Sequence, residues 1–363
     1  MLPAHCLRRV FDLLVAAVCS SAALCAAQGV PASDGAGGKR AIALVLPFYA
    51  PELGAAAEAV RQGVETANRV SGSRYAIQLW HTDASPERVA QAYESAIVAG
   101  ARAIIGPMTR SGVTALARAR AGAQHGAPGQ GPPIVALNQP DADIALPPRF
   151  FAFGLALDAE ARVVAQLVWR QNLRAVAVVG TQTPLARRST EAFVDEWLRL
   201  GGDITEVYEV PPGADLIVLR DRIAAKPAEA VFLAADPGRA AALRPYLGNQ
   251  ALVFSTSQVN ASGAAQVGTL DLAGIRFVEM PWLLQPNHPA VAAYPRPPGL
   301  AGDLERLFAL GIDAFRVAAA LADGARTAEI DGVTGRIRFA PPSTITREPL
   351  AATFRAGVAV PLE

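Results

Sequence analysis

The stretch IALVL at residues 42–46 is a continuous apolar run, and a helical segment over about 53–69 follows it after a short loop. Further apolar runs follow at residues 76–80, 103–105 and 134–137, with helices predicted after Ser85 and Ser111. Continuous apolar strands that alternate with helices are typical of a parallel sheet covered by helices on both faces. The first 150 residues therefore predict one such sheet.

The same alternation then begins again. A helix is expected over 163–169, and a later helix places Phe193, Trp197 and Leu200 on one face by their spacing of four and three. Apolar strands are expected at residues 175–179, 204–208, 230–233, 252–254 and 275–278. Two successive sets of strand–helix units predict an α/β protein with two doubly wound parallel-sheet (Rossmann-like) lobes around a cleft.

The chain is expected to cross back to the first lobe near residues 281–284. A helix over 302–323 follows, with an apolar stripe, and residues from 335–339 onward alternate like a short strand or hairpin. The stripe consists of Leu304, Leu307, Phe308, Ile312 and Phe315. These features divide the chain into an N-terminal lobe, 41–157 with 285–330, and a C-terminal lobe, 158–284 with part of 331–363.

The first 27 residues have the pattern of a cleaved signal peptide. Arg8 and Arg9 precede an apolar run of about 15 residues, shorter than the roughly 20 that span a bilayer, and small residues follow up to Ala27. A retained membrane anchor is the alternative. Residues 28–40 are rich in Gly, Ala, Ser and Pro and predict a flexible leader.

All three cysteines, Cys6, Cys19 and Cys25, lie in this first segment. Cleavage after Ala27 would leave a chain that needs no disulfide. A lipid-attachment site is the competing interpretation, although Val18 and Leu24, rather than small residues, precede the two candidate cysteines. We therefore expect a soluble periplasmic protein, with an outer-membrane lipoprotein as the alternative.

Composition excludes several classes of function. The whole chain has 33 basic and 32 acidic residues, and only Lys39 and Lys226 are lysines. No basic block is present, so nothing indicates a nucleic-acid footprint. No Gly-x-Ser-x-Gly elbow, phosphate loop or His-Glu-x-x-His helix occurs. We expect no catalytic residues, no metal and no cofactor.

Ligands of open parallel sheets approach the carboxyl ends of the strands. That rule selects loop residues that could face one cleft. The candidates are Tyr49, Asp83, Thr109, Ser111, Asn138 and Gln139 in the first lobe, and Asp236, Ser257 and Glu279 in the second.

The segment IIGPMTRSG at residues 104–112 carries the most specific pattern. A strand ends, Gly106 and Pro107 turn the chain, and Thr109 and Ser111 open a helix. Free amides and the helix dipole at such a point can hold a carboxylate. The alternative is that Thr109 or Ser111 only caps its own helix.

With the strands IALVLPF (42–48) and PIVALNQ (133–139), this turn resembles the amino-acid receptors of the type I periplasmic-binding-protein superfamily. The resemblance implies that Thr109 and Ser111 bind a ligand's carboxylate and that Asp236 or Glu279 faces its ammonium group. Met108 and Arg110 are bulkier than that pocket usually tolerates. A substrate-binding protein of an amino-acid ABC importer is therefore one functional hypothesis.

The second half of the chain resembles another family. The segments that carry the resemblance are FSTSQVN (254–260), DLAGIRFVEMPWLL (271–284), DLERLFALGIDAFRVAAAL (303–321) and IDGVTGRIRFAPPSTITREPLAATFRAGVAVPLE (330–363). Their order is similar to the penicillin-binding protein activator (LpoA) family. The resemblance implies a non-catalytic protein that binds a class A penicillin-binding protein from the outer-membrane side and stimulates peptidoglycan synthesis. Many members also carry an N-terminal helical-repeat domain and a lipidated cysteine, which this sequence does not match.

Four residues of these segments have physical interpretations. Gly335 is expected to supply a backbone angle that other residues reach only with strain. Asp313, on a mostly apolar helix, must find a partner or face water. Trp282 and Phe315 are expected in the core, because large aromatic side chains are mostly buried.

Overall fold

The computed structural model describes residues 39–122, 131–141, 144–260 and 269–362. The expected signal peptide (1–27), with all three cysteines, and the leader up to residue 38 lie outside the described residues. Arg40 already belongs to the first strand, so order begins one residue earlier than expected. Residues from Arg40 onward form one compact unit.

The first lobe is built on a five-stranded parallel sheet in the order β2-β1-β3-β4-β5. Its strands are β1 (Arg40–Leu46), β2 (Tyr75–His81), β3 (Ala103–Ile105), β4 (Ile134–Ala136) and β5 (Phe150–Ala152). The four expected strands are confirmed. The fifth, β5, was not expected, because three residues are too short for a periodicity to show.

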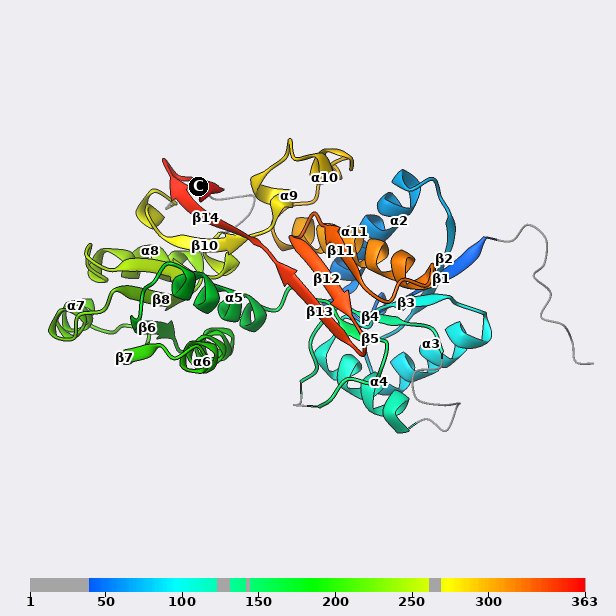
Figure 1. The fold of residues 1–363 in the computed structure, drawn as a ribbon, viewed down its shortest axis with the longest axis horizontal. Coiled ribbons are helices and arrows are strands. Elements are labelled where there is room, and N and C mark those ends of the chain that lie inside the picture. The colour runs from blue at the N-terminus through cyan, green and yellow to red at the C-terminus, as the bar shows by residue number, and fades with distance from the viewer. Residues whose placement is uncertain (1–38, 123–130, 142–143, 261–268, 363) are drawn as a thin grey trace, which may run out of the picture. The chain divides into compact units, whose positions relative to one another are not determined.

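Two pairs of helices cover this sheet (Figure 1). The helices are α2 (Gly54–Val70), α3 (Pro86–Val98), α4 (Arg110–Gly122) and α11 (Asp303–Ala322). Helices α2 and α11 bury one face, and α3 and α4 bury the other. Helices α2 and α11 pack closely at two glycines. An added Cβ on Gly63 would lie 2.0 Å from the carbonyl oxygen of Phe308, and one on Gly311 would lie 2.3 Å from that of Val60, so a larger side chain would not fit at either position.

The second lobe is built on a seven-stranded sheet in the order β15-β14-β10-β9-β8-β6-β7. Its strands are β6 (Ala175–Thr181), β7 (Asp203–Val210), β8 (Ala230–Ala234), β9 (Leu252–Ser255), β10 (Arg276–Glu279), β14 (Leu350–Arg355) and β15 (Val358–Pro361). Five strands are parallel, as expected. The last two strands of the chain add an antiparallel edge beside β10, which the sequence did not predict.

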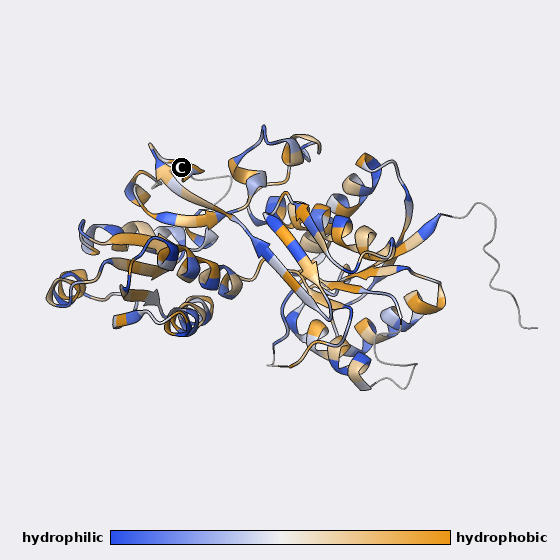
Figure 2. Ribbon diagram, viewed as in Figure 1, coloured by the Kyte–Doolittle hydropathy of each residue, from blue (hydrophilic) through white to orange (hydrophobic). Residues whose placement is uncertain are grey.

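Alternate side chains of β8 show how this sheet is covered. Phe232 faces α5 (Leu157–Arg170) and α6 (Pro184–Arg199), with its ring 4.1 Å from that of Phe193, whereas Val231 and Leu233 face α7 (Leu216–Ala225) and α8 (Pro237–Leu243). Helix α5 begins six residues before the expected position. Figure 2 shows the apolar strands as orange bands between helices that carry blue outer residues.

A third, antiparallel sheet connects the lobes and confirms the expected hairpin. It consists of β11 (Ala328–Asp331), β12 (Arg336–Ala340) and β13 (Thr344–Glu348). Phe339 packs into the core of the first lobe, 5.8 Å from the ring of Phe151. Only Pro349 separates β13 from β14, so the chain leaves this sheet directly into the second lobe. The residue boundaries given above for the lobes stay a prediction.

The turn between β11 and β12 is fixed by the buried carboxylate of Asp313 on α11. Its oxygens accept hydrogen bonds from the amides of Val333 (3.1 Å) and Thr334 (2.7 Å) and from the Thr334 hydroxyl (2.7 Å), and Arg316 lies 3.2 Å away. Burial raises the pKa of Asp313, and Arg316 and these donors oppose the rise. Of the two expected outcomes for Asp313, a partner or exposure to water, the structure shows the partner.

The neighbouring signature residues also behave as expected. Gly335 has a φ of +133°, and a Cβ there would lie 2.4 Å from the carbonyl oxygen of Glu348. Trp282 and Phe315 are buried in the core of the first lobe. Trp282 lies on the short helix α9 (Pro281–Leu284), which begins the return to that lobe before α10 (Pro289–Ala292).

We expect Asp313→Asn to lower the free energy of unfolding by about 2–4 kcal/mol, because an amide group would replace one acceptor oxygen that faces several buried donors. Urea unfolding followed by circular dichroism measures the loss. Asp331→Asn is the matched control, because Asp331 lies at the same turn with a largely exposed side chain. Equal stability of the two variants would contradict the role given to Asp313.

Candidate functional site

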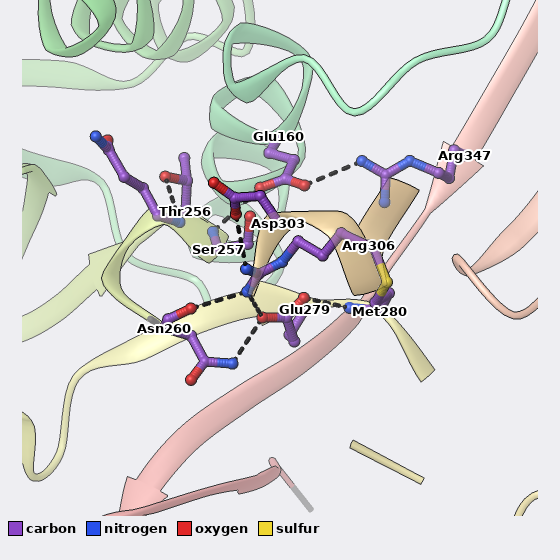
Figure 3. Close-up of polar contacts among 10 residues, drawn as sticks. Glu160, Thr256, Ser257, Asn260, Glu279, Met280, Asp303, Arg306 and Arg347 are labelled. Carbon is purple, nitrogen blue, oxygen red and sulfur yellow. Dashed lines mark hydrogen bonds and ion pairs between the residues drawn. The ribbon is translucent and has the colours of Figure 1, made fainter. Parts of the chain in front are cut away.

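Polar side chains from both lobes meet at the carboxyl ends of β9 and β10 (Figure 3). Glu279, the last residue of β10, is 1% exposed. One of its oxygens lies 2.5 Å from Arg306 and accepts a hydrogen bond from the side-chain amide of Asn260 (2.7 Å). The other accepts one from the backbone amide of Met280 (3.0 Å).

Arg306 reaches this carboxylate from α11, which belongs to the core of the first lobe. Its guanidinium also donates to the carbonyl oxygen of Asn260 (2.9 Å) and lies 3.3 Å from Asp303. Burial works to lower the pKa of Arg306, but Glu279 and Glu160 hold it above its usual value. Burial raises the pKa of Glu279, and Arg306 opposes that rise. The pair therefore joins the two lobes through a buried, charge-assisted contact.

A second buried pair lies beside the first. Glu160 on α5 contacts Arg347 on β13 at 3.0 Å, and both side chains are less than a tenth exposed. The other Glu160 oxygen accepts a hydrogen bond from the amide of Ser257 (3.1 Å), and Arg347 donates to the carbonyl oxygen of Thr334 (3.1 Å). This pair ties the connecting sheet to the first helix of the second lobe.

The arrangement is suited to holding the lobes in one orientation. A buried charge without its partner is costly, so each pair favours the geometry that brings its two members together. Both carboxylates are neutralised by arginines of the same chain. Neither Glu160 nor Glu279 is therefore free to face the ammonium group of a ligand.

Of the nine residues selected from the sequence, the structure brings only Ser257 and Glu279 into this network. Thr109 accepts a hydrogen bond from the amide of Gly112 (3.2 Å), and Asp236 accepts one from that of Arg239 (3.0 Å), so each caps its own helix. Ser111 is exposed in the first turn of α4. Thr109 therefore acts as a helix cap, and a ligand role for Thr109, Ser111 and Asp236 stays a prediction.

Three of the other four candidates contact neighbouring segments of the chain, and Asp83 contacts its own loop. Asn138 donates to the carbonyl oxygen of Met108 (3.0 Å), and Gln139 donates to that of Ala152 (3.2 Å). The Tyr49 hydroxyl lies 3.3 Å from a ring nitrogen of His81. Asp83 accepts hydrogen bonds from the hydroxyl and amide of Ser85, which lower its pKa. A ligand role for these residues stays a prediction.

The sequence did not point to Glu160, Asn260, Arg306 or Arg347. The sequence gives one indication for Arg306. With Glu305 it stands between Leu304 and Leu307 of the apolar stripe, where an arginine is expected only if it is paired or exposed. Glu160 and Arg347 are 187 residues apart, and the sequence gives none for them.

Within the described ranges, no cluster of three or more His, Cys, Asp or Glu side chains is arranged to hold a metal ion. The same residues include no helix with the length and apolar character needed to cross a bilayer.

Comparison with known proteins identifies relatives. The family model described as "LppC putative lipoprotein" matches residues 38–357. The chain is 27% identical over 286 residues to the penicillin-binding protein activator LpoA of Yersinia pseudotuberculosis, an alignment that covers 63% of this chain and 42% of the relative. The LpoA of Edwardsiella ictaluri is 24% identical over 373 residues, with 89% and 52% covered. The chain spans about half the length of these curated relatives.

Two solved structures are similar over most of the chain. The C-domain of LpoA from Haemophilus influenzae, described as a regulator of PBP1A, aligns with a TM-score of 0.72 and 21% identity over 89% of this chain and 99% of that one. A "putative branched-chain amino acid ABC transporter" from Chromobacterium violaceum aligns with a TM-score of 0.71 and 34% identity over 87% and 100%. These likenesses confirm the predicted type I periplasmic-binding-protein fold.

We expect Arg306→Met to lower the free energy of unfolding by about 3–5 kcal/mol, because it leaves Glu279 buried without its cation. Arg187→Met is the matched control. It breaks an exposed pair with Glu209 (2.8 Å) and should cost less than about 1 kcal/mol. Urea unfolding of both variants measures the difference, and equal losses would refute the assignment of Arg306 as a buried contact between lobes.

The loss of unfolding free energy caused by Arg306→Met should depend on pH. Burial already raises the pKa of Glu279 above its ordinary value of 4.5, and removal of Arg306 raises it further. A carboxyl whose pKa is higher in the folded state loses stability as pH rises from its unfolded pKa towards its folded pKa. The difference in unfolding free energy between the variant and the wild type should therefore decrease as pH falls from about 7 towards about 5. Urea midpoints across this range test it, and a difference that stays constant would contradict it.

Proposed function

Because the chain belongs to the LppC lipoprotein family, whose model matches residues 38–357, we propose that it activates a class A penicillin-binding protein and so regulates peptidoglycan synthesis. It would act by protein contact and catalyse no reaction itself. The observation that carries this proposal is the family match across nearly all described residues, together with curated relatives named as activators.

The two buried ion pairs support a docking role. A protein that works by contact benefits from a surface whose parts keep one arrangement, because binding then requires little ordering. The Glu279–Arg306 and Glu160–Arg347 contacts hold α11, β10, β13 and α5 together across the lobes.

The alternative function, delivery of an amino acid to an importer, is favoured by the turn at residues 104–112 and by the 34% identity to the Chromobacterium violaceum structure. The side chains argue against it. Such a receptor needs an acidic group for the ligand's ammonium, but Glu279 is neutralised by Arg306 and Asp236 caps α8. The activator is therefore the better-supported function.

We also propose that the protein works in the periplasm. The leader at residues 1–27 supports export. The family's description as a lipoprotein favours attachment through a lipid to the periplasmic face of the outer membrane. An acylated Cys19 or Cys25 would provide that attachment.

The purified protein is expected to bind the class A synthase of its own organism and to raise its rate of glycan polymerisation or peptide cross-linking. The rate is measured on lipid-linked precursor with and without the protein, and serum albumin serves as the control. A thermal-shift screen across the amino acids that carry a single carboxylate should be flat. Absence of binding and stimulation would overturn the proposal, and a shift with one of these amino acids would favour the importer instead, because a ligand of the folded state raises its melting temperature.

A further inference from the structure

A pocket of about 430 Å³ lies beside the Glu160–Arg347 pair, between α5 and the connecting strands β12 and β13. Loop residues that follow β4 and β5, among them Gln139 and Gly154, close one side. Pockets that bind small organic molecules have volumes of about 300–1,000 Å³. The cavity is therefore large enough for a ligand of several carbon atoms.

The charges that line this pocket do not balance. Its basic residues are Arg162, Arg170, Arg338 and Arg347, and its acidic residues are Glu160 and Glu348. Arg347 forms an ion pair with Glu160, whereas Glu348 lies near two arginines, Arg170 (3.3 Å) and Arg338 (3.8 Å).

The groups just outside the lining do not remove this excess. Glu329 accepts two hydrogen bonds from Arg338 (3.0 and 3.3 Å) and lies 3.7 Å from Arg336, so one outer carboxylate is added together with one outer guanidinium and the excess is unchanged. Glu196 lies on the neighbouring helix α6 and is paired with Arg199 (2.7 Å), which lowers its pKa most strongly. Gln166 donates a hydrogen bond to it (2.7 Å), and the charge of Arg162 lowers its pKa further. The pocket therefore keeps two more positive than negative charges.

Arg162 is the cation with the fewest partners. Its guanidinium donates to the carbonyl oxygen of Asp158, one turn earlier in its own helix (3.3 Å). Among the described residues, no carboxylate lies within 4.0 Å of it. Arg162, Gln166 and Arg170 recur every four residues, so they share one face of α5, and all three line the pocket.

We propose that this pocket binds an organic anion with at least two carboxylates, held by Arg162 and Arg170 from α5 and by Arg338 from β12. A guanidinium matches a carboxylate with two parallel hydrogen bonds, so three arginines on two sides of a cavity favour separated carboxylates over one small anion. Phe153, Val163 and Ile345 provide an apolar wall for the carbon chain of the ligand.

Bound there, the ligand links α5 of the second lobe to the connecting sheet. A free polycarboxylate and an acidic peptide of the cell wall both carry this chemistry. Anion binding is measured without a synthase, so the proposal goes beyond the proposed function and does not depend on it.

The test is calorimetric titration and thermal unfolding of the whole protein with three probes. These are tricarballylate, a wall tetrapeptide with free carboxylates, and the same peptide with its carboxylates amidated. Tricarballylate or the free peptide should bind and raise the melting temperature. The amidated peptide should not. Binding of one probe alone identifies the source of the anion and supports the site.

Arg162→Ala and Arg170→Ala should each weaken binding about tenfold or more, because each removes hydrogen bonds to a charged group. The control is Arg220→Ala, an exposed arginine on α7 beside Asp221, which should bind as the wild type does. Three results would overturn the proposal: no binding of either carboxylate probe, equal binding of the amidated peptide, or equal weakening by all three variants. Because Arg162 is exposed, its variant should unfold without ligand at the wild-type temperature.

Discussion

The contact between Glu279 and Arg306 is the constraint on which the relation between the two lobes depends. Glu279 ends a strand in the middle of the second sheet, and Arg306 projects from a helix that covers the first. In the docked structure both charges are buried, so removal of either partner would leave the other unpaired, at a cost of several kcal/mol. The same holds for Glu160 and Arg347. Docking of the lobes is therefore enforced by electrostatics in addition to the backbone that connects them.

This constraint changes how a receptor-like fold is used. In an open parallel sheet the carboxyl ends of the strands are the natural place for a ligand. Here the acidic groups at that edge of the second sheet bind arginines and helix amides of the same chain. The fold then serves as a body with fixed surfaces, which suits a protein that acts on a protein partner. The excess positive charge lies elsewhere, between α5 and the connecting sheet.

The alternation of apolar runs and helices was enough to predict the fold class and nine strands, because it reports directly on a parallel sheet buried on both faces. It missed β5, which has three residues. It assigned part of 331–363 to the second lobe but did not show that β14 and β15 extend its sheet as antiparallel strands. The candidate site was harder to predict. Threonine and aspartate occur both as ligand contacts and as helix caps, so the residue types of Thr109 and Asp236 do not distinguish these roles. Their hydrogen bonds show that both cap their own helices. Glu160 and Arg347 become neighbours only after both lobes have formed.

The order of the strands also determines when each lobe can be completed during synthesis. Helix α11, which covers one face of the first sheet, is made after all the parallel strands of the second sheet, and β14 comes near the end of the chain. While the chain grows, one face of the first sheet is therefore covered by α2 without α11, and β10 lacks its outer neighbour. Contacts between residues so far apart in sequence form slowly. Apolar surfaces and strand edges that stay exposed in the meantime are prone to aggregation. Neither lobe can therefore be completed until the C-terminal part of the chain, from α11 onward, has been made.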